Sequence, residues 1–362
     1  MSIRSYIHIG SAKCASTSLQ EHYFDKHPEL FHLGCSAGGL VPPYYNPAVK
    51  LALEWDLRLA CDFVYDHERV SETFADCGKD FADSGRKYMG ISSESFTMSM
   101  HHECDITQTA DRLCRLFGKE SKILFITRSQ DDHLKSIYKE WIWGGMPLTW
   151  REFLNAIFYG QFQSLYSELF FDRIAEYYAN LFGRENLLVL PVELLFQNQA
   201  DFLTRISNFL EIEDCIHELP NANKARPESM VEHMRQMNEV NRHNIGRSVM
   251  EPANTFRHDE YYTEILGMPA PPDNDADIRR KRQNVRLTQL GDSDGSNHAM
   301  KLDWTADPVV VAHMEEKYRE GNGRLAEYLD LDLGQWGYEK LSITNRSEDD
   351  SGWRKWLPKS GA

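Results

Sequence analysis

A short run near the start of the chain, IHIGSAKCASTSLQ (7–20), gathers residue types that bind an oxyanion. Lys13 supplies a positive charge, and the hydroxyls of Ser16, Thr17 and Ser18 can donate hydrogen bonds. The backbone amides of the loop and the N-terminus of a following helix would point at the same place. The run departs from the Walker pattern, in which a lysine directly precedes the hydroxyl that binds magnesium. A ligand that reacts without Mg²⁺ therefore suits this loop better than ATP.

A second anion-binding pair lies further along the chain. Arg128 ends the apolar run KILFITR, and Ser136 follows eight residues later. An arginine fork and a serine hydroxyl can hold a phosphate, and the carboxyl end of a strand is where α/β proteins bind ligands. Two separated anion sites indicate a nucleotide phosphorylated at both ends. The simpler alternative remains open: the first run only caps a helix, Arg128 pairs with an aspartate, and Ser136 lies on a helix surface.

Strand-like and helix-like segments alternate along the chain and would position these residues. This alternation predicts an α/β protein with a three-layer fold of the P-loop type, in which helices flank a central parallel β-sheet, with helical and loop insertions. A final helical segment over 310–331 is expected to break or bend near its Gly-Asn-Gly sequence. The predicted strands are 6–9, 87–95, 122–128 and 186–193, and the predicted helices are 16–25, 109–118, 129–143 and 200–212.

Composition limits the classes of ligand and partner. The net charge of −15 argues against broad binding to nucleic acid or to an anionic membrane, so an anionic ligand needs a local basic cluster. The seven cysteines are scattered and form no C-x-x-C pair, which is typical of a reducing compartment. No apolar stretch is long enough for a membrane span, and no signal-peptide pattern is present. We therefore expect a cytoplasmic protein without a membrane span.

The two motifs together resemble those of sulfotransferases that use 3′-phosphoadenosine-5′-phosphosulfate (PAPS). In that family a K-x-G-[ST]-[ST]-[ST] loop holds the 5′-phosphosulfate, and an arginine with a serine eight residues later holds the 3′-phosphate. Further segments resemble the bacterial, carbohydrate-type branch: LKSIYKEWIWGGMPLTWREFL, LPVELLFQNQADFLTRISNFLEI, NANKARPESMVEHMRQMN and GNGRLAEYLDLDLGQWGY. Two positions depart from the pattern. Ala15 replaces the loop glycine, and Val192 replaces a tyrosine, which leaves the adenine-stacking residue unidentified.

The resemblance implies a transferase that moves the sulfuryl group of PAPS to a hydroxyl or amine and releases adenosine 3′,5′-bisphosphate (PAP). No metal is expected, and the acceptor would be a carbohydrate, a glycolipid or a small natural product. Lys13 is the expected catalytic lysine. The expected base is Glu94, with His101 or His102 as the alternative. The expected nucleotide-binding residues are Lys13, Cys14, Ala15, Ser16, Thr17, Ser18, Arg128, Ser136, Lys224 and Arg226.

We expect one sulfotransferase-like domain over 1–341 and, because its sequence is polar, a mobile tail over 342–362. The segments 35–86 and 244–305, which include the basic run Arg279–Arg282, are expected to be acceptor-side insertions. Two other functions stay open: a P-loop nucleotide kinase or ATPase, and a catalytically silent PAP-binding protein of the same fold. The sequence does not indicate the oligomeric state.

Overall fold

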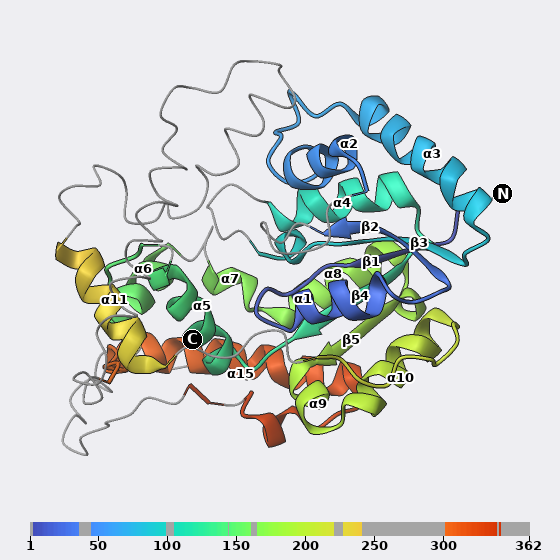
Figure 1. Cartoon of the computed structure of the whole chain (residues 1–362). Coiled ribbons are helices and arrows are strands. Elements are labelled where there is room, and N and C mark those ends of the chain that lie inside the picture. Colours follow the sequence, from blue (N-terminus) through green and yellow to red (C-terminus); the bar gives the residue numbers. More distant parts are fainter. Residues whose placement is uncertain are drawn as a thin grey trace, which may run out of the picture.

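A five-stranded parallel sheet forms the centre of the computed structural model (Figure 1). Its strands are β1 (Ser5–His8), β2 (Leu30–Cys35), β3 (Tyr88–Ser92), β4 (Lys122–Thr127) and β5 (Leu187–Pro191), in the order β2-β3-β1-β4-β5. The structure describes residues 3–35, 45–98, 105–143, 145–160, 165–220, 227–240, 301–338 and 340–341. The predicted α/β fold with a parallel sheet is confirmed.

Strand periodicity explains the three layers. Successive side chains of a strand point to opposite faces, so each apolar strand supplies two separate cores. In β4, Ile123 and Phe125 join one buried cluster, whereas Leu124 and Ile126 join the other. Helices cover both faces because each strand exposes apolar side chains on both sides.

The helices over the larger cluster include α4 (Ile106–Phe117) and α8 (Phe171–Phe182), which contact each other. The smaller cluster contains residues of α1 (Ser16–Leu19), of the π-helix that follows it (Gln20–Phe24), and of α10 (Gln199–Leu210). The remaining long helices are α3 (His67–Ser84), α5 (Gln130–Trp143), α6 (Trp150–Tyr159), α11 (Glu228–Val240) and α15 (Pro308–Leu329). Shorter α-helices are α2 (Pro47–Leu51), α7 (Leu165–Glu168) and α9 (Val192–Gln197).

The strand order creates a switch point between β1 and β4. From β1 the chain continues toward β2 at one edge of the sheet, and from β4 it continues toward β5 at the other edge (Figure 1). The chain segments after these two neighbouring strands therefore lead in opposite directions, and ligands of open α/β sheets usually bind outside the carboxyl ends of strands at such a point. Backbone bonds hold the two ends together: Ser11 N–H donates to the Ile126 carbonyl at 2.7 Å.

Most of the predicted elements are present, with ends shifted by a few residues. α4 begins at Ile106, three residues before the expected start, with Asp105 as its N-cap, and Gly118 ends it as expected, with a φ of 86°. The helix expected over 16–25 is α-helical only to Leu19 and then continues as a π-helix. The segment 45–86, which the sequence left unassigned, contains α2, α3 and a π-helix over Ala52–Asp56.

One local expectation is wrong: α15 runs unbroken through Gly321 to Gly323. A Cβ on Gly321 would lie 2.5 Å from Asp172 Oδ1 of α8, so this glycine permits close packing between the two helices. Its neighbour Asn322 is buried and exchanges two hydrogen bonds with Gln130 of α5, both at 2.9 Å. The Gly-Asn-Gly sequence thus serves helix packing and not a helix end.

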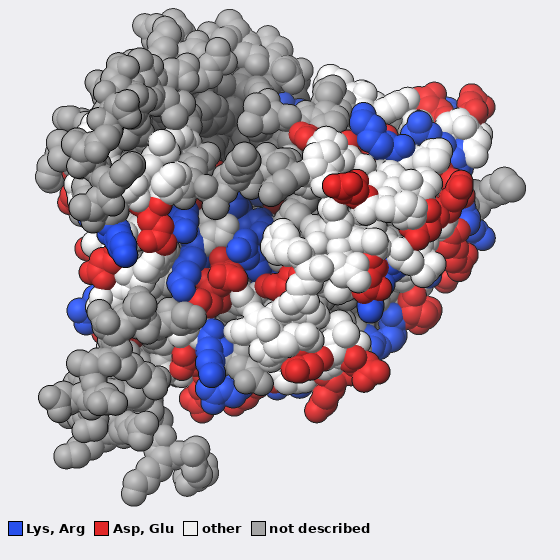
Figure 2. Space-filling model, turned by 60° about the horizontal axis from the view of Figure 1, so that its bottom comes forward, with Lys and Arg blue, Asp and Glu red and all other residues white. Residues whose placement is uncertain are grey.

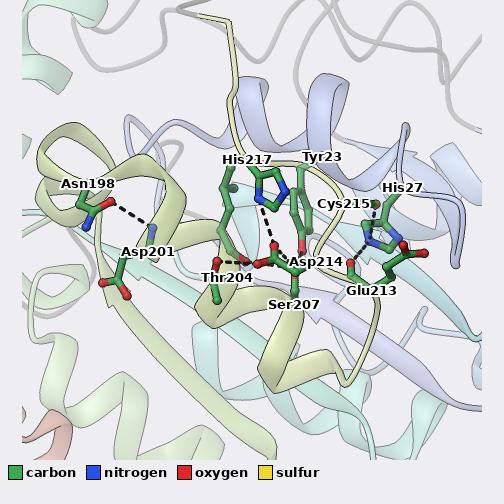
Figure 3. A network of polar contacts seen from close by, with 11 residues as sticks. Tyr23, His27, Asn198, Asp201, Thr204, Ser207, Glu213, Asp214, Cys215 and His217 are labelled. Carbon is green, nitrogen blue, oxygen red and sulfur yellow. Dashed lines mark hydrogen bonds and ion pairs between the residues drawn. The ribbon is translucent and has the colours of Figure 1, made fainter.

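A polar network ties the helix that follows the first loop to α10 (Figure 3). The hydroxyls of Tyr23 and Ser207 share a hydrogen bond at 2.8 Å, and Thr204 donates to Asp214 at 2.7 Å. His27 Nε2 bonds to the Glu213 carbonyl at 2.9 Å. These contacts lie on the face of the sheet that carries the smaller cluster. They hold the π-helix in place, and with it the loop after β1 that precedes α1.

No helix among the residues that the structure describes is long and apolar enough to cross a membrane.

Candidate active site

The loop after β1 packs tightly against the segment that follows β3. Gly10 has a φ of 102°, and a Cβ there would lie 2.9 Å from Glu94 Cα, so a side chain would not fit. Thr97 donates to the Ile9 carbonyl at 2.8 Å, and Ser16 donates to the Ser11 carbonyl at 3.2 Å. The backbone of the loop is therefore fixed by its own neighbours.

Two non-glycine residues of the loop have a left-handed conformation, with φ values of 62° at Lys13 and 60° at Ala15. A side chain in this region costs about 1–2 kcal/mol per residue. The glycine-to-alanine departure noted in the sequence is thus accommodated, but with strain. Cys14 between them is buried, and burial raises the pKa of its thiol, so it is present as the neutral thiol at neutral pH.

The hydroxyls at the start of α1 differ in their surroundings. Ser16 is 3% exposed and donates to the loop backbone, so its hydrogen stabilises the loop itself. Thr17 and Ser18 are half-buried in the same first turn. The anion-binding donors nearest to solvent in this turn are therefore those of Thr17 and Ser18.

Lys13 and Arg128 meet through the backbone. Arg128 Nη1 donates to the Lys13 carbonyl at 3.1 Å, although the two residues are 115 positions apart. The side chain of Lys13 points to α5, where its Nζ pairs with Glu140 Oε2 at 3.3 Å. Both motifs thus meet at the carboxyl ends of β1 and β4.

Ser136 lies on the same side of α5 as Glu140, because residues four apart share a helix face. Since Glu140 contacts Lys13, this face is turned toward the loop. Ser136 is half-buried. Arg128 thus contacts the expected 5′-phosphosulfate loop directly, and Ser136 lies one turn before Glu140 on the α5 face that contacts this loop.

Glu94 is also at this edge of the sheet. It begins a short 3₁₀-helix, Glu94–Phe96, directly after β3, and its backbone contacts Gly10. Its charge acts on Cys14 in the loop. The expected alternatives His101 and His102, and the expected phosphate ligands Lys224 and Arg226, lie outside the described residues, as do the Arg279–Arg282 run and the tail over 342–362.

Sequence reasoning missed a carboxylate behind the site. Glu193 is the second residue of α9, and its Oε1 accepts the backbone N–H of Ser129 at 2.8 Å, in the turn that follows Arg128. Tyr338 is buried and its hydroxyl lies between Glu193 Oε2, at 3.3 Å, and Thr127 Oγ1, at 2.9 Å. Burial raises the pKa of Glu193, an effect opposed by the Ser129 N–H and by the charge of Arg128.

A buried histidine lies in the first turn of α5, next to the β4–α5 turn; its backbone N–H donates to the Ser129 carbonyl at 2.9 Å. His133 of α5 is fully buried and stacks on Phe171, with ring centroids 6.0 Å apart. Burial, reinforced by the charge of Arg128, lowers its pKa to about 3. The side chain is therefore neutral at physiological pH and cannot serve as a cation for a phosphate.

Three further features bear on the choice of ligand. Among the described residues there is no cluster of three or more His, Cys, Asp or Glu side chains that could hold a metal ion. On the face shown in Figure 2, Lys and Arg side chains gather around a central hollow beside acidic ones, although the whole chain is acidic. Trp141 and Trp150 are core residues at 5% and 4% exposure, so they cannot form a stacking wall for a sugar.

Comparison with known proteins finds a likeness at the level of solved structures. No family model matches the chain, and no curated protein matches it. A solved structure described as a sulfotransferase from Alicyclobacillus acidocaldarius is similar at 16% identity with a TM-score of 0.43, and the alignment covers 69% of this chain and 99% of that chain. This likeness assigns no role to any residue here.

Proposed function

We propose that the chain is a sulfotransferase that uses PAPS as its donor. The observation that carries the proposal is the hydrogen bond from Arg128 to the Lys13 carbonyl at the β1–β4 switch point. It supports the proposal because a nucleotide with phosphates at both ends needs two phosphate-binding motifs near each other, and one residue of each motif takes part in this contact. The likeness of both motifs to the family's own supports the same donor.

In the proposed reaction an acceptor hydroxyl or amine attacks the sulfur of PAPS in line with the bond to the bridging oxygen. That sulfur–oxygen bond breaks, its electron pair stays on the phosphate, and PAP leaves. Lys13 Nζ would neutralise the negative charge that develops on the bridging oxygen, and the loop amides with Thr17 and Ser18 would hold the phosphate oxygens. Arg128 and Ser136, with Lys224 and Arg226, would bind the 3′-phosphate.

A base must take the acceptor proton, and Glu94 is our first assignment. Its position beside Gly10, at the same sheet edge as Lys13, supports this role. His101 and His102 are the alternative bases. We propose a carbohydrate, a glycolipid or a small natural product as the acceptor and the cytoplasm as the compartment.

Thermal unfolding with different nucleotides tests the donor. PAP at about 100 times its Kd should stabilise the wild type by about 2.7 kcal/mol, and ATP with Mg²⁺ should not match it. Arg128→Ala should lose most of the PAP effect. Arg205→Ala, which removes an exposed arginine paired with Asp201, is the matched control and should keep it. Stabilisation only by ATP with Mg²⁺ would refute the proposal and favour a kinase.

Turnover separates an enzyme from a silent binding protein. We expect PAP release from PAPS to rise when a mixture of carbohydrate acceptors is added, and Lys13→Ala to abolish the increase. PAP binding without PAPS turnover on any acceptor would support the binding-protein alternative.

A further inference from the structure

A chain of polar contacts holds the turn between β4 and α5, which contains Arg128. It extends to Tyr338, close to the last of the residues that the structure describes. It starts at the Ser129 N–H, passes through Glu193 and the Tyr338 hydroxyl, and returns to the end of β4 at Thr127. The contacts thus enclose Arg128 between two anchored neighbours in the sequence. A residue between two fixed positions has little freedom to change its backbone direction.

The position of Glu193 follows from the sheet. In the parallel pairing of β4 with β5, Thr127 lies opposite Pro191, so the residues after each strand emerge next to each other. Glu193 is two residues past Pro191 and reaches back to the N-terminus of α5. The first backbone N–H groups of a helix have no partner within it, and a carboxylate there satisfies one of them.

The C-terminal part of the chain holds the other side of this turn. Asn322 of α15 donates to the Tyr338 carbonyl and exchanges bonds with the Gln130 side chain, the residue after Ser129. Gln130 also donates to the Leu169 carbonyl at 3.2 Å. The β4–α5 turn is therefore fixed by contacts from α9, from α15 and from the segment that contains Tyr338.

We propose that Glu193, held by Tyr338, is a positioning residue that orients Arg128 for the 3′-phosphate of the donor. This inference rests on the proposed function, because it assigns a partner to the same arginine. Glu193 acts through the Ser129 N–H and does not touch the nucleotide. Its loss would free the turn, and Arg128 would then have to be ordered when the phosphate binds, at the expense of affinity.

Binding of two nucleotides separates positioning from general damage. PAP carries the 3′-phosphate and adenosine 5′-monophosphate (AMP) lacks it, so only PAP should respond to the orientation of Arg128. In Glu193→Ala we expect the Kd for PAP to rise about tenfold, the size of one lost hydrogen bond to a charged group, with the Kd for AMP unchanged. Isothermal titration calorimetry at one salt concentration measures both.

Two milder variants keep the test informative if Glu193→Ala does not fold. Glu193→Gln retains an oxygen that can accept the Ser129 N–H, so it should bind PAP within about threefold of the wild type. Tyr338→Phe removes only the bridging hydroxyl and should weaken PAP about threefold, without an effect on AMP. Tyr177→Phe, which removes the hydroxyl bonded to Asp111 on another face of the fold, is the matched control and should change neither.

The outcomes are distinct. An equal loss of PAP and AMP in Glu193→Ala, or unchanged PAP binding in both Glu193→Ala and Tyr338→Phe, would overturn the positioning role. Tighter PAP binding in both Glu193→Ala and Glu193→Gln would overturn it as well, because the carboxylate would then act only by repelling the phosphate. A wild type that binds PAP and AMP equally would instead remove the two-phosphate site, and with it the proposed function.

Discussion

The two cations of the candidate site are held in different ways. Arg128 is half-buried, and the turn around it is fixed by hydrogen bonds from three other elements. The Lys13 side chain is 34% exposed and pairs with Glu140 of α5, itself 39% exposed. In the proposed reaction, a fixed arginine suits the 3′-phosphate, which does not react. A more exposed lysine can adjust its position as negative charge develops on the bridging oxygen. Under the proposed function, the site would therefore divide into a rigid binding half around Arg128 and an adjustable reacting half around Lys13.

Removal of the Lys13 amine tests this division most strongly. In Lys13→Ala we expect kcat to fall by about 10²–10³, because the charge on the leaving oxygen loses its partner, while the Kd for PAP changes far less. Steady-state kinetics and calorimetry give the two quantities. Lys26→Ala, which removes a surface lysine paired with Asp25, is the control. Equal losses in kcat and in PAP affinity would show that both cations serve binding.

The rigid half should be more sensitive to acid. The pKa of His133 in the folded protein, about 3, lies below its ordinary value of 6.5, so the unfolded chain takes up a proton first as the pH falls. Stability that is present above pH 6.5 is then lost toward pH 3, by up to about 1.4 kcal/mol per pH unit for this group.

Urea unfolding at pH 7 and pH 5 measures this effect. The free energy of unfolding of the wild type should fall between pH 7 and pH 5. The fall in His133→Asn should be smaller by up to about 2 kcal/mol. His217→Asn, at a histidine with a side chain 62% exposed, should follow the wild type. An identical pH dependence in His133→Asn would mean that this histidine does not titrate on unfolding.

Strain in the reacting half can be released at Ala15. Its φ of 60° suits glycine, so Ala15→Gly relieves backbone strain in the folded protein. Glycine also gives the unfolded chain more conformational freedom, which offsets part of this gain. The free energy of unfolding should therefore rise by about 0.5–1 kcal/mol. The same change in the interior of α8, Ala179→Gly, should lower stability by about 0.5–1 kcal/mol. Loss of stability in both variants would contradict the strain assigned to the loop.

The smallest effect is expected at Glu140. Glu140→Gln removes a carboxylate that competes with an anion for Lys13, so PAP should bind about two- to fivefold tighter, the range of an exposed ion pair. The gain should shrink as salt is added, because salt screens exposed charges. Glu120→Gln, at an exposed glutamate, is the control. A weaker PAP complex in Glu140→Gln would show that this ion pair orders the site.

The sequence predicted those features of the fold that depend on a local pattern of residues. The apolar run over 122–128 predicted β4, which the structure confirms, whereas the anion site expected from the charge and hydroxyls of the first loop stays a prediction. Both signals lie within short windows, in which side-chain period and helix caps decide the structure. The confirmed α/β fold follows from repetition of those windows.

The supporting contacts depend on residues far apart in the sequence. Glu193 is 64 positions from Ser129, and Tyr338 is 211 positions from Thr127, so no local pattern connects them. One signal was available: Glu193 follows the apolar strand LLVLP, at the sheet edge where Arg128 was placed. Gly321 was misread for the same reason, since the residue that requires it, Asp172, lies on another helix.

The contacts of Asn322 and Tyr338 also set an order of assembly during synthesis. The Lys13 loop and Arg128 leave the ribosome early, but the residues that close the β4–α5 turn come 194 and 210 positions after Arg128. At about 5–20 residues per second, Tyr338 is added about 10–40 s after Arg128. A nascent chain that ends before α15 would carry both phosphate motifs without the contacts that fix them. Under the proposed function, the nucleotide site would therefore become rigid only late in synthesis.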